Sequence, residues 1–280
     1  MTRDGASLGP GRERALPVIV QDNPERPDRF VMTMDQHTAF AGKLAEAFGN
    51  KRFDVIENTA VHYVIAHHDA GWKPVDAEVH INPATGFPYH LAGTPLELTS
   101  KTMRGSPDFN AAHHALSGLI SSMHTAGLLN GRYGLAPPGI LARFEGDKLA
   151  FAEKVLADER ARQEELKPLA GSDEPEVWRA YKQLQFFDML SLYFHANGEG
   201  QRGESTFPDV PTACDGDVAI AITEGGDGTY VLDPFPFAKD GISISFEGRW
   251  MTPVKQGEDS KDIFAATDVS TQTVKLSAAA

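Results

Sequence analysis

Apolar residues recur every three or four positions along much of the first 200 residues, which is the spacing of helices that bury one face. This periodicity predicts helices over about residues 34–48, 54–69, 110–129, 141–166 and 174–195. Residues 72–108 hold five prolines and little periodicity. We therefore expect a long loop there, of the kind that forms lids or substrate walls.

After Gly198 the pattern changes to alternation of apolar and polar residues, which is typical of strands. Strands are expected at about 218–222, 230–232 and 242–246, with a glycine-rich hairpin turn between the first two and another short strand at 16–20. The chain is thus predicted to be mainly α, with a small C-terminal antiparallel β region. Its expected divisions are a flexible tail (1–17), a helical domain (18–200) and a small β region packed on the helices (201–280).

Composition places the chain among globular proteins, with 41% hydrophobic and 23% charged residues. No apolar run approaches the roughly 18 residues of a membrane-spanning helix, and the first residues contain no apolar signal segment. A net charge of −13 disfavours non-specific binding to the phosphate backbone of nucleic acid. We therefore expect a cytoplasmic protein with no membrane and no nucleic acid among its partners.

The chain has one cysteine, Cys214, and ten histidines, so any metal site must use imidazole and carboxylate ligands. Asp188 lies in the apolar helix segment QFFDMLSLYF, where a buried carboxylate needs a cationic partner, either an arginine or a metal. His68 and Asp69 end one predicted helix, and His37 lies on the buried face of another. These side chains form a ligand set for a divalent ion (Fe, Mn, Ni, Co or Zn).

The segments that carry these residues resemble those of the bacterial family called domain of unknown function 3891. The likeness rests on DQHTAFAGKLAEAFGN, VIAHHDAGW, SSMHTAGLLNGRYG, LQFFDMLSLYF and VLDPFPF, which occur in this order between about residues 34 and 250. The order His, His-Asp, Asp also resembles that of the HD-domain metal-dependent phosphohydrolases. The resemblance implies an HD-like helical bundle with a metal at His37, His68, Asp69 and Asp188, followed by a short β region.

His124 is a further candidate, as a ligand of a second ion or as an acid that faces a phosphate, and the alternative is a hydrogen-bonded core histidine. It shares the predicted helix 110–129 with His113, on the same face but about 16 Å away along the axis, so the two cannot hold one ion. His90, in the predicted loop, is the alternative extra ligand. Structural roles are expected for the remaining histidines, which are His62, His80, His113, His114 and His195.

Candidates for substrate binding follow two of these segments. Arg132 and Tyr133 lie in a glycine-flanked turn, and an arginine near a metal suits a phosphate or carboxylate through paired hydrogen bonds. Trp72 and Lys73 come directly after the His68-Asp69 pair, where Trp72 is interpreted as a pocket wall or a core residue and Lys73 as a substrate contact or a solvated side chain.

Three functions remain open on these grounds. The first is a hydrolase of HD type, in which one ion, or two with Asp69 as a bridge, activates water for attack on a small phosphorylated or anionic substrate, with Asp69 and His124 as the catalytic pair. The second is an HD-type non-haem di-iron oxygenase, which needs further ligands such as His124 with His90. The third is a non-catalytic metal-binding domain. The expected partner is a small-molecule substrate, and a homodimer is left open.

Overall fold

The computed structural model describes residues 19–23, 26–137, 144–214 and 216–279. The predicted tail, residues 1–17, lies outside this part of the chain. The helices are α1 (Met34–Ala47), α2 (Thr59–His67), α3 (Lys73–Asp76), α4 (Leu96–His113), α5 (Ala115–Asn130), α6 (Gly146–Leu166), α7 (Glu174–Ala196) and α8 (Ser260–Ala266). Short 3-10 segments are η1 (Ala70–Trp72), η2 (Leu91–Gly93), η3 (Arg132–Gly134) and η5 (Lys167–Leu169).

The strands of the described chain form one seven-stranded sheet in the order β1-β2-β6-β7-β5-β4-β3. Their bounds are β1 (Ile19–Gln21), β2 (Arg29–Met32), β3 (Ser205–Pro211), β4 (Asp217–Gly226), β5 (Thr229–Asp233), β6 (Ile242–Met251) and β7 (Val269–Ala278). Neighbouring strands are antiparallel except β5 and β7, which pair in parallel. The sheet is therefore mixed.

The expectation of a mainly α chain, an HD-like helical bundle with a small C-terminal antiparallel β region, is wrong. The sheet is large and mixed, and it takes in two strands that precede the first helix, β1, which pairs with β2, and β2, which pairs with β6. The short strand expected at 16–20 overlaps β1 at residues 19 and 20, and its other residues lie outside the described part of the chain. Sequence patterning missed β2 because this strand is only four residues long. It missed β7 because this strand is mostly polar and has few apolar residues, of which Val274 and Leu276 are buried.

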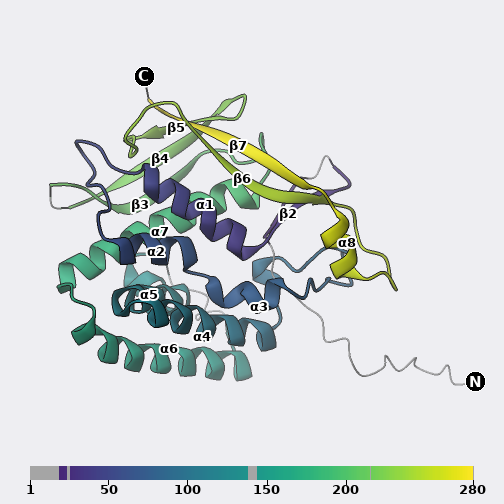
Figure 1. Ribbon diagram of the computed structural model, residues 1–280, viewed down its shortest axis with the longest axis horizontal. Coiled ribbons are helices and arrows are strands. Elements are labelled where there is room, and N and C mark those ends of the chain that lie inside the picture. Colours follow the sequence, from purple (N-terminus) through teal and green to yellow (C-terminus); the bar gives the residue numbers. More distant parts are fainter. Residues whose placement is uncertain (1–18, 24–25, 138–143, 215, 280) are drawn as a thin grey trace, which may run out of the picture.

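The helices pack on one face of this sheet in successive layers (Figure 1). Helix α1 contacts β6, and α7 contacts β1 and β3, so these two helices lie against the sheet. Helices α2 and α5 pack on α1 and α7, and α4 and α6 pack on α5. The space between α1, α2, α5 and α7 is thus the interior of the protein, where a polar side chain is out of contact with bulk water.

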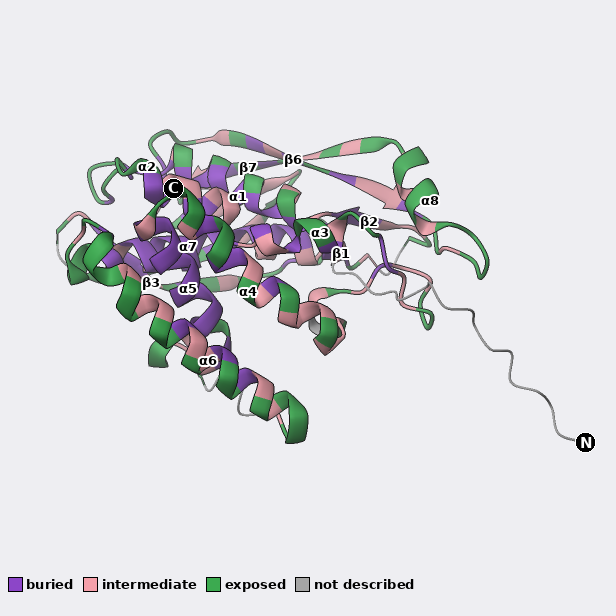
Figure 2. Cartoon of the chain, turned by 60° about the horizontal axis from the view of Figure 1, so that its bottom comes forward, coloured by how far each residue is buried: buried purple, intermediate pink, exposed green. Residues whose placement is uncertain are grey.

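Helix α5 is buried almost all round, whereas α6 shows a long exposed face (Figure 2). Small residues allow α5 to lie close to its neighbours. A Cβ added to Gly118 would stand 2.5 Å from the Cβ of Ala111 in α4, closer than real side chains approach. The sequence GLISSMHTAG therefore gives a helix that fits between two others and carries His124 into the interior.

Two of the helix boundaries differ from the prediction. The expected loop over residues 72–108 contains α3 and most of α4, which accommodates Pro107 in its interior. The single helix expected over 110–129 is two helices, because His114 is extended (φ −157°, ψ 140°) and its Nδ1 accepts a hydrogen bond from the Leu116 N–H as the N-cap of α5. His113 and His124 therefore lie on different helices.

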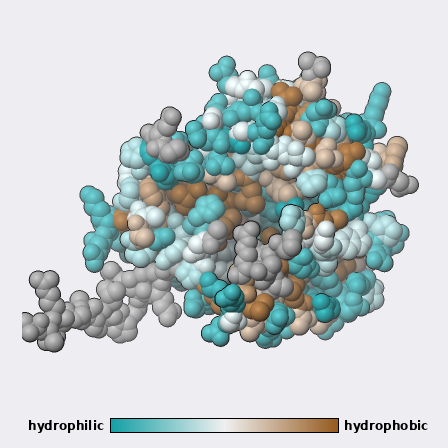
Figure 3. Space-filling model, turned by 180° about the vertical axis from the view of Figure 1, so that it is seen from behind, coloured by the Kyte–Doolittle hydropathy of each residue, from teal (hydrophilic) through white to brown (hydrophobic). Residues whose placement is uncertain are grey.

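The surface mixes hydrophilic side chains with apolar patches near the middle of the face seen from behind (Figure 3). The most exposed large apolar residues of the described chain include Leu169 at 68% and Val55 at 61%. Exposed apolar side chains of this kind are normal on monomers, so the homodimer stays a prediction. Among the described helices, none is long and apolar enough to cross a membrane.

Candidate metal centre

Five side chains with metal-binding atoms converge in the interior between four helices. They form two groups whose ligand atoms lie within 4.8 Å of one another, and His68 belongs to both. The first group is His37, His68 and Asp69, and the second is His68, His124 and Asp188. The structure thus brings together all five residues that the sequence nominated as metal ligands.

Asp188 lies at the middle of this cluster, in the second half of α7. Its Oδ1 is 3.3 Å from His37 Nε2 and 3.5 Å from His68 Nε2. Asp69 Oδ2 lies 3.8 Å from the same nitrogen, His68 Nε2. Two carboxylates therefore face one imidazole nitrogen, and a third donor, His37, is within reach of the same point.

The backbone around His68 is held by contacts to α4 and α5. The carbonyls at the end of a helix have no partners within it, and here Asn110 donates to the His67 carbonyl at 2.9 Å and Ser121 donates to that of His68 at 3.5 Å. Gly71 then passes so close to α4 that an added Cβ would stand 2.4 Å from the Ser106 nitrogen. The sequence HHDAGW is thus fixed as a tight turn that points His68 inward.

The orientation of the His68 ring follows from one hydrogen bond. Its Nδ1 donates to the Ile65 carbonyl at 2.9 Å, which leaves Nε2 toward the carboxylates. His67 turns away, because its own Nδ1 donates to the Tyr63 carbonyl at 2.8 Å. Only the second histidine of the pair therefore takes part in the cluster.

Charge and burial perturb the titration of both central groups. Burial lowers the pKa of His68, but the contact with Asp188 and the charges of Asp69 and Asp188 outweigh burial and raise the pKa to about 9. Burial raises the pKa of Asp188, yet the hydrogen bond from His37 and the contact with His68 hold it well below its ordinary value. The cluster thus stabilises positive charge between the two carboxylates.

His124 meets the cluster from α5 and is oriented by a residue that the sequence analysis did not nominate. His124 Nδ1 lies 2.8 Å from the side-chain amide of Gln185, which leaves Nε2 as the remaining nitrogen toward the cluster. For Nε2 to bind an ion, Nδ1 must carry the proton and donate it to the amide oxygen of Gln185, because the opposite direction would put the proton on Nε2. Burial lowers the pKa of His124 to about 4. The ring is therefore neutral at pH 7, as a metal ligand must be, and is not a cationic acid.

The residues present fit a divalent cation. His68 Nε2 is buried and makes no hydrogen bond within the described chain, although two carboxylates lie nearby. Imidazole nitrogens and carboxylate oxygens are the donors that Zn, Mn, Fe, Co and Ni accept, at about 2.0–2.2 Å in the case of zinc. Donors separated by 3.3–3.8 Å can surround an ion at such bond lengths.

A second residue outside the nominated set is His195, for which the sequence predicts a structural role. It is fully buried, and its Nδ1 is 3.1 Å from His37 Nδ1. Burial and the neighbouring His37 and Arg202 lower its pKa well below the ordinary value. The signal that could have identified both His195 and Gln185 is their spacing: Gln185 is three residues before Asp188 and His195 is seven residues after it, which places these polar residues on the same face of α7.

Arg132 lies beside this cluster on a backbone that few side chains adopt. The four residues Gly131, Arg132, Tyr133 and Gly134 have consecutive positive φ angles of 69°, 55°, 58° and 89°. The left-handed conformation costs roughly 1–2 kcal/mol for each residue with a Cβ, and such strain is concentrated at functional sites. Here it turns the Arg132 guanidinium toward Met189, the neighbour of Asp188, and onto its sulfur as a hydrogen-bond donor.

The other nominated residues lie in varied surroundings. The Tyr133 hydroxyl accepts a hydrogen bond from Gln163 at 2.9 Å, and Lys73 Nζ forms a surface ion pair with Asp35 at 2.9 Å. Trp72, 8% exposed, packs in the main core. His90 lines a separate hollow of about 370 Å³ together with residues of β1, β2 and the loop segment 82–88. His90 belongs to neither candidate metal group.

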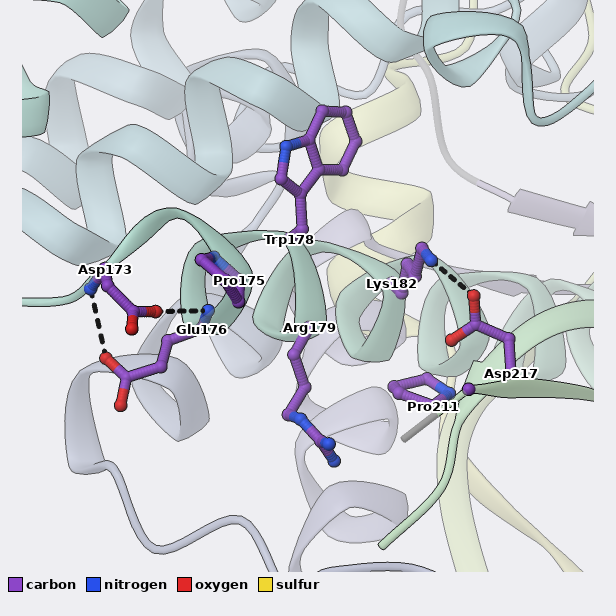
Figure 4. Close-up of a pocket in the computed structure, with 9 residues that line it drawn as sticks. Asp173, Pro175, Glu176, Trp178, Arg179, Lys182, Pro211 and Asp217 are labelled. Atoms are coloured by element: carbon purple, nitrogen blue, oxygen red, sulfur yellow. Dashed lines mark hydrogen bonds and ion pairs between the residues drawn. The ribbon is translucent and has the colours of Figure 1, made fainter. Parts of the chain in front are cut away.

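Another hollow, of about 350 Å³, lies at the first half of α7 (Figure 4). Its two cations are already paired, because Lys182 binds Asp217 and Arg179 lies 3.2 Å from Asp54. Trp178 points away from both of them in the figure. None of the five candidate ligands lines this hollow, so it is separate from the cluster.

Comparison with known proteins gives one result at the level of a family. The family model described as "Protein of unknown function (DUF3891)" matches residues 18–252, which include every candidate ligand. No curated protein and no solved structure matches the chain.

Proposed function

This chain belongs to the DUF3891 family, and from its site we propose that it is a metal-dependent hydrolase that acts on a small phosphorylated or otherwise anionic substrate. The observation that carries the proposal is that two groups of donor side chains, His37-His68-Asp69 and His68-His124-Asp188, meet at the buried His68. The order of these ligands along the chain is also that of HD-type phosphohydrolases, although the surrounding fold is not the expected bundle. A divalent ion in such a site lowers the pKa of bound water to about 7 and so supplies a nucleophile at neutral pH.

The donor set favours one ion over two. His68 has a single free nitrogen, because Nδ1 is bound to the Ile65 carbonyl, and yet His68 belongs to both groups of donors. The extra ligand that a di-iron oxygenase requires was expected from His90, which lies in another part of the described structure. This observation favours the hydrolase over the oxygenase.

The side chains divide into holding and positioning roles. Asp188 supplies a buried anionic ligand between two imidazoles, whose 3.3 and 3.5 Å contacts keep it ionised. The Asp69 side chain is 16% exposed, against 7% for Asp188, and we infer from this greater access that water and substrate approach from the side of Asp69. We assign to Asp69 the removal of a proton from the attacking water, and to neutral His124 a ligand or hydrogen-bond role toward the substrate.

Arg132 supplies the preference for an anion. Within the described chain no carboxylate forms an ion pair with it, and its Nη1 contacts only the weak acceptor sulfur of Met189. A half-buried guanidinium that is not neutralised favours a phosphate or carboxylate, which it binds through paired charge-assisted hydrogen bonds. Arg132 therefore orients the anionic part of the substrate beside the metal ligands.

The test begins with metal content of protein purified without added metal or chelator, for the wild type and for Asp188→Asn. Hydrolysis of p-nitrophenyl phosphate and of a panel of small phosphate esters is measured on the same samples. We expect about one Mn, Fe, Co, Ni or Zn per chain in the wild type, and loss of both metal and hydrolysis in the variant. Asp158→Asn, which removes only an exposed ion pair with Arg104 and Lys154, is the matched control and keeps both.

The rival functions give different results in the same experiment. Two irons per chain with oxygen uptake would replace the hydrolase with a di-iron oxygenase. One ion without hydrolysis of any ester in the panel would leave a non-catalytic metal-binding domain. Full metal retention in Asp188→Asn would show that the ion is held elsewhere.

A further inference from the structure

His195 lies two turns beyond Asp188 on α7 and contacts a metal ligand from the side opposite the cluster. Its Nδ1 is 3.1 Å from Nδ1 of His37, and the two ring planes are inclined at 71°. Both side chains are buried, with His195 at 0% exposure and His37 at 0%. The contact is therefore a hydrogen bond between two imidazoles, out of reach of bulk water.

The direction of this hydrogen bond follows from the function of His37. His37 Nε2 faces Asp188 Oδ1 at 3.3 Å, so Nε2 is the nitrogen that can bind a cation. A neutral imidazole that offers the lone pair of Nε2 carries its proton on Nδ1, and this N–H needs an acceptor. His195 Nδ1 is the acceptor within reach, which requires that His195 carries its own proton on Nε2.

The surroundings of His195 agree with this assignment. Its Nε2 is buried and makes no hydrogen bond among the described residues, and its ring packs against Phe246 and Phe40 with centroids 4.5 and 5.0 Å apart. A buried N–H without a partner is destabilising, and a phenylalanine at this position would avoid that cost. The polar function of the ring therefore lies at Nδ1, on the side of His37.

We propose that His195 is a positioning residue that holds His37 in the tautomer and orientation needed to bind the metal. This inference rests on the proposed metal centre and adds a group to it that touches neither metal nor substrate. The usual acceptor behind a metal-bound histidine is a carboxylate, a backbone carbonyl or water. A neutral imidazole does the same without placing a second buried negative charge close to Asp188.

The experiment uses two substitutions that differ in one respect. His195→Phe keeps an aromatic ring but removes the acceptor, whereas His195→Asn places a carbonyl oxygen near the position of Nδ1. His62→Phe is the matched control, because His62 also makes one partly buried hydrogen bond, from Nε2 to the Ile56 carbonyl at 2.7 Å. His62 is not part of the cluster. Zn²⁺ affinity is measured by competition with a chelator, and the visible spectrum is recorded with Co²⁺.

We expect His195→Phe to weaken Zn²⁺ binding about 10–100-fold, the usual effect of losing such a partner, and to change the Co²⁺ spectrum. His195→Asn should restore both to near the wild-type values, and His62→Phe should change neither. A structural role for His195 would not be rescued by Asn in this way. Unchanged Zn²⁺ affinity and Co²⁺ spectrum in a folded His195→Phe would overturn the proposal.

A measurement on the wild-type protein tests the same tautomer assignment without relying on a variant that folds. Long-range ¹H–¹⁵N correlation NMR of the Zn²⁺-loaded protein identifies which nitrogen of each imidazole carries the proton. We expect His37 protonated at Nδ1 and His195 at Nε2, and a proton on His195 Nδ1 would refute the assignment. If the wild type binds Zn²⁺ with this pattern but hydrolyses nothing, the hydrolase proposal fails while the role of His195 stands. If it binds no Zn²⁺, both fail.

Discussion

Gly127 of α5 and Tyr181 of α7 meet so closely that a Cβ on the glycine would stand 2.2 Å from the tyrosine hydroxyl. The contact lies one turn beyond His124 on α5 and two turns before Asp188 on α7. The Tyr181 hydroxyl is buried and makes no hydrogen bond within the described chain. The distance between α5 and α7, each of which carries a candidate metal ligand, is therefore set by a glycine and a hydroxyl that has no partner in the described chain.

This contact predicts the outcome of a double-mutant cycle. Gly127→Ala should lower the free energy of unfolding by about 1–3 kcal/mol, the usual cost of an overpacked interior. Tyr181→Phe should be close to neutral, because the lost hydroxyl has no partner, and it should recover a large part of the loss in the double variant. Urea unfolding measures all four proteins. Gly93→Ala, whose added methyl would meet only Tyr89 at 3.9 Å, is the control, and equal losses at positions 93 and 127 would contradict the account.

Asp76 predicts a pH dependence of stability. Burial raises its pKa to about 8, against hydrogen bonds from the Met34 and Asp35 N–H groups and together with the charges of Asp35 and Asp69. A folded-state pKa above the ordinary 3.8 means that the stability contributed by the protonated carboxyl is full below about pH 4 and is lost as the pH rises through about 8.

The comparison is between the wild type and Asp76→Asn, which keeps an acceptor for the Met34 N–H but does not ionise. We expect the variant to gain stability relative to the wild type as the pH rises from 5 to 9. Chemical unfolding at several pH values measures this difference. A constant difference across that range would show that Asp76 is ionised throughout.

Metal binding should stabilise the fold, because the ligands come from α1, α5, α7 and the end of α2 and are assembled only in the folded chain. An ion at one hundred times its dissociation constant adds about 2.7 kcal/mol to the free energy of unfolding. We expect Zn²⁺ or Mn²⁺ to raise the melting temperature of the wild type and EDTA to reverse the rise. Asp188→Asn should show neither effect, and an equal rise in this variant would place the ion outside the cluster.

Arg132 should control the use of anionic substrates. Arg132→Lys and Arg132→Gln should both lower kcat/KM for a phosphate ester, by about tenfold or more, because a lysine does not reproduce the paired hydrogen bonds of the guanidinium. Metal content should stay the same, since Arg132 is not a ligand. Arg160→Gln, on the exposed face of α6, serves as the control. Unaltered kinetics in both Arg132 variants would remove this residue from substrate binding.

Hydrophobic patterning predicted the fold only where an element is long and amphipathic. Helices α1 and α7 agree with the expected ranges within a few residues, because each has a capping box at its start and a clear apolar face. The sheet was underestimated because β2 is too short to show alternation and β7 is mostly polar. A helix break at His114 was also missed, since no glycine or proline stands there to mark it.

The cluster of candidate ligands was predictable because each member is a polar residue on an apolar helix face or in the turn at a helix end. Asp188 is the clearest case, since a carboxylate amid QFFDMLSLYF has no stable alternative to a cationic partner. The supporting residues Gln185 and His195 were not nominated, because their roles depend on which nitrogen of a neighbouring imidazole faces them. Hydrophobic periodicity shows on which face of a helix a histidine lies, but not which nitrogen of its ring faces a given neighbour.

The position of β7 in the sheet determines when the sheet can be completed during synthesis of the chain at the ribosome. This strand lies between β6 and β5, so it alone joins the half-sheet β1-β2-β6 to the half-sheet β5-β4-β3. It is also the last of the described strands to be synthesised. Until residues 269–278 leave the exit tunnel, the nascent chain holds two sheets with open edges, and a chaperone or a second nascent chain can pair with either.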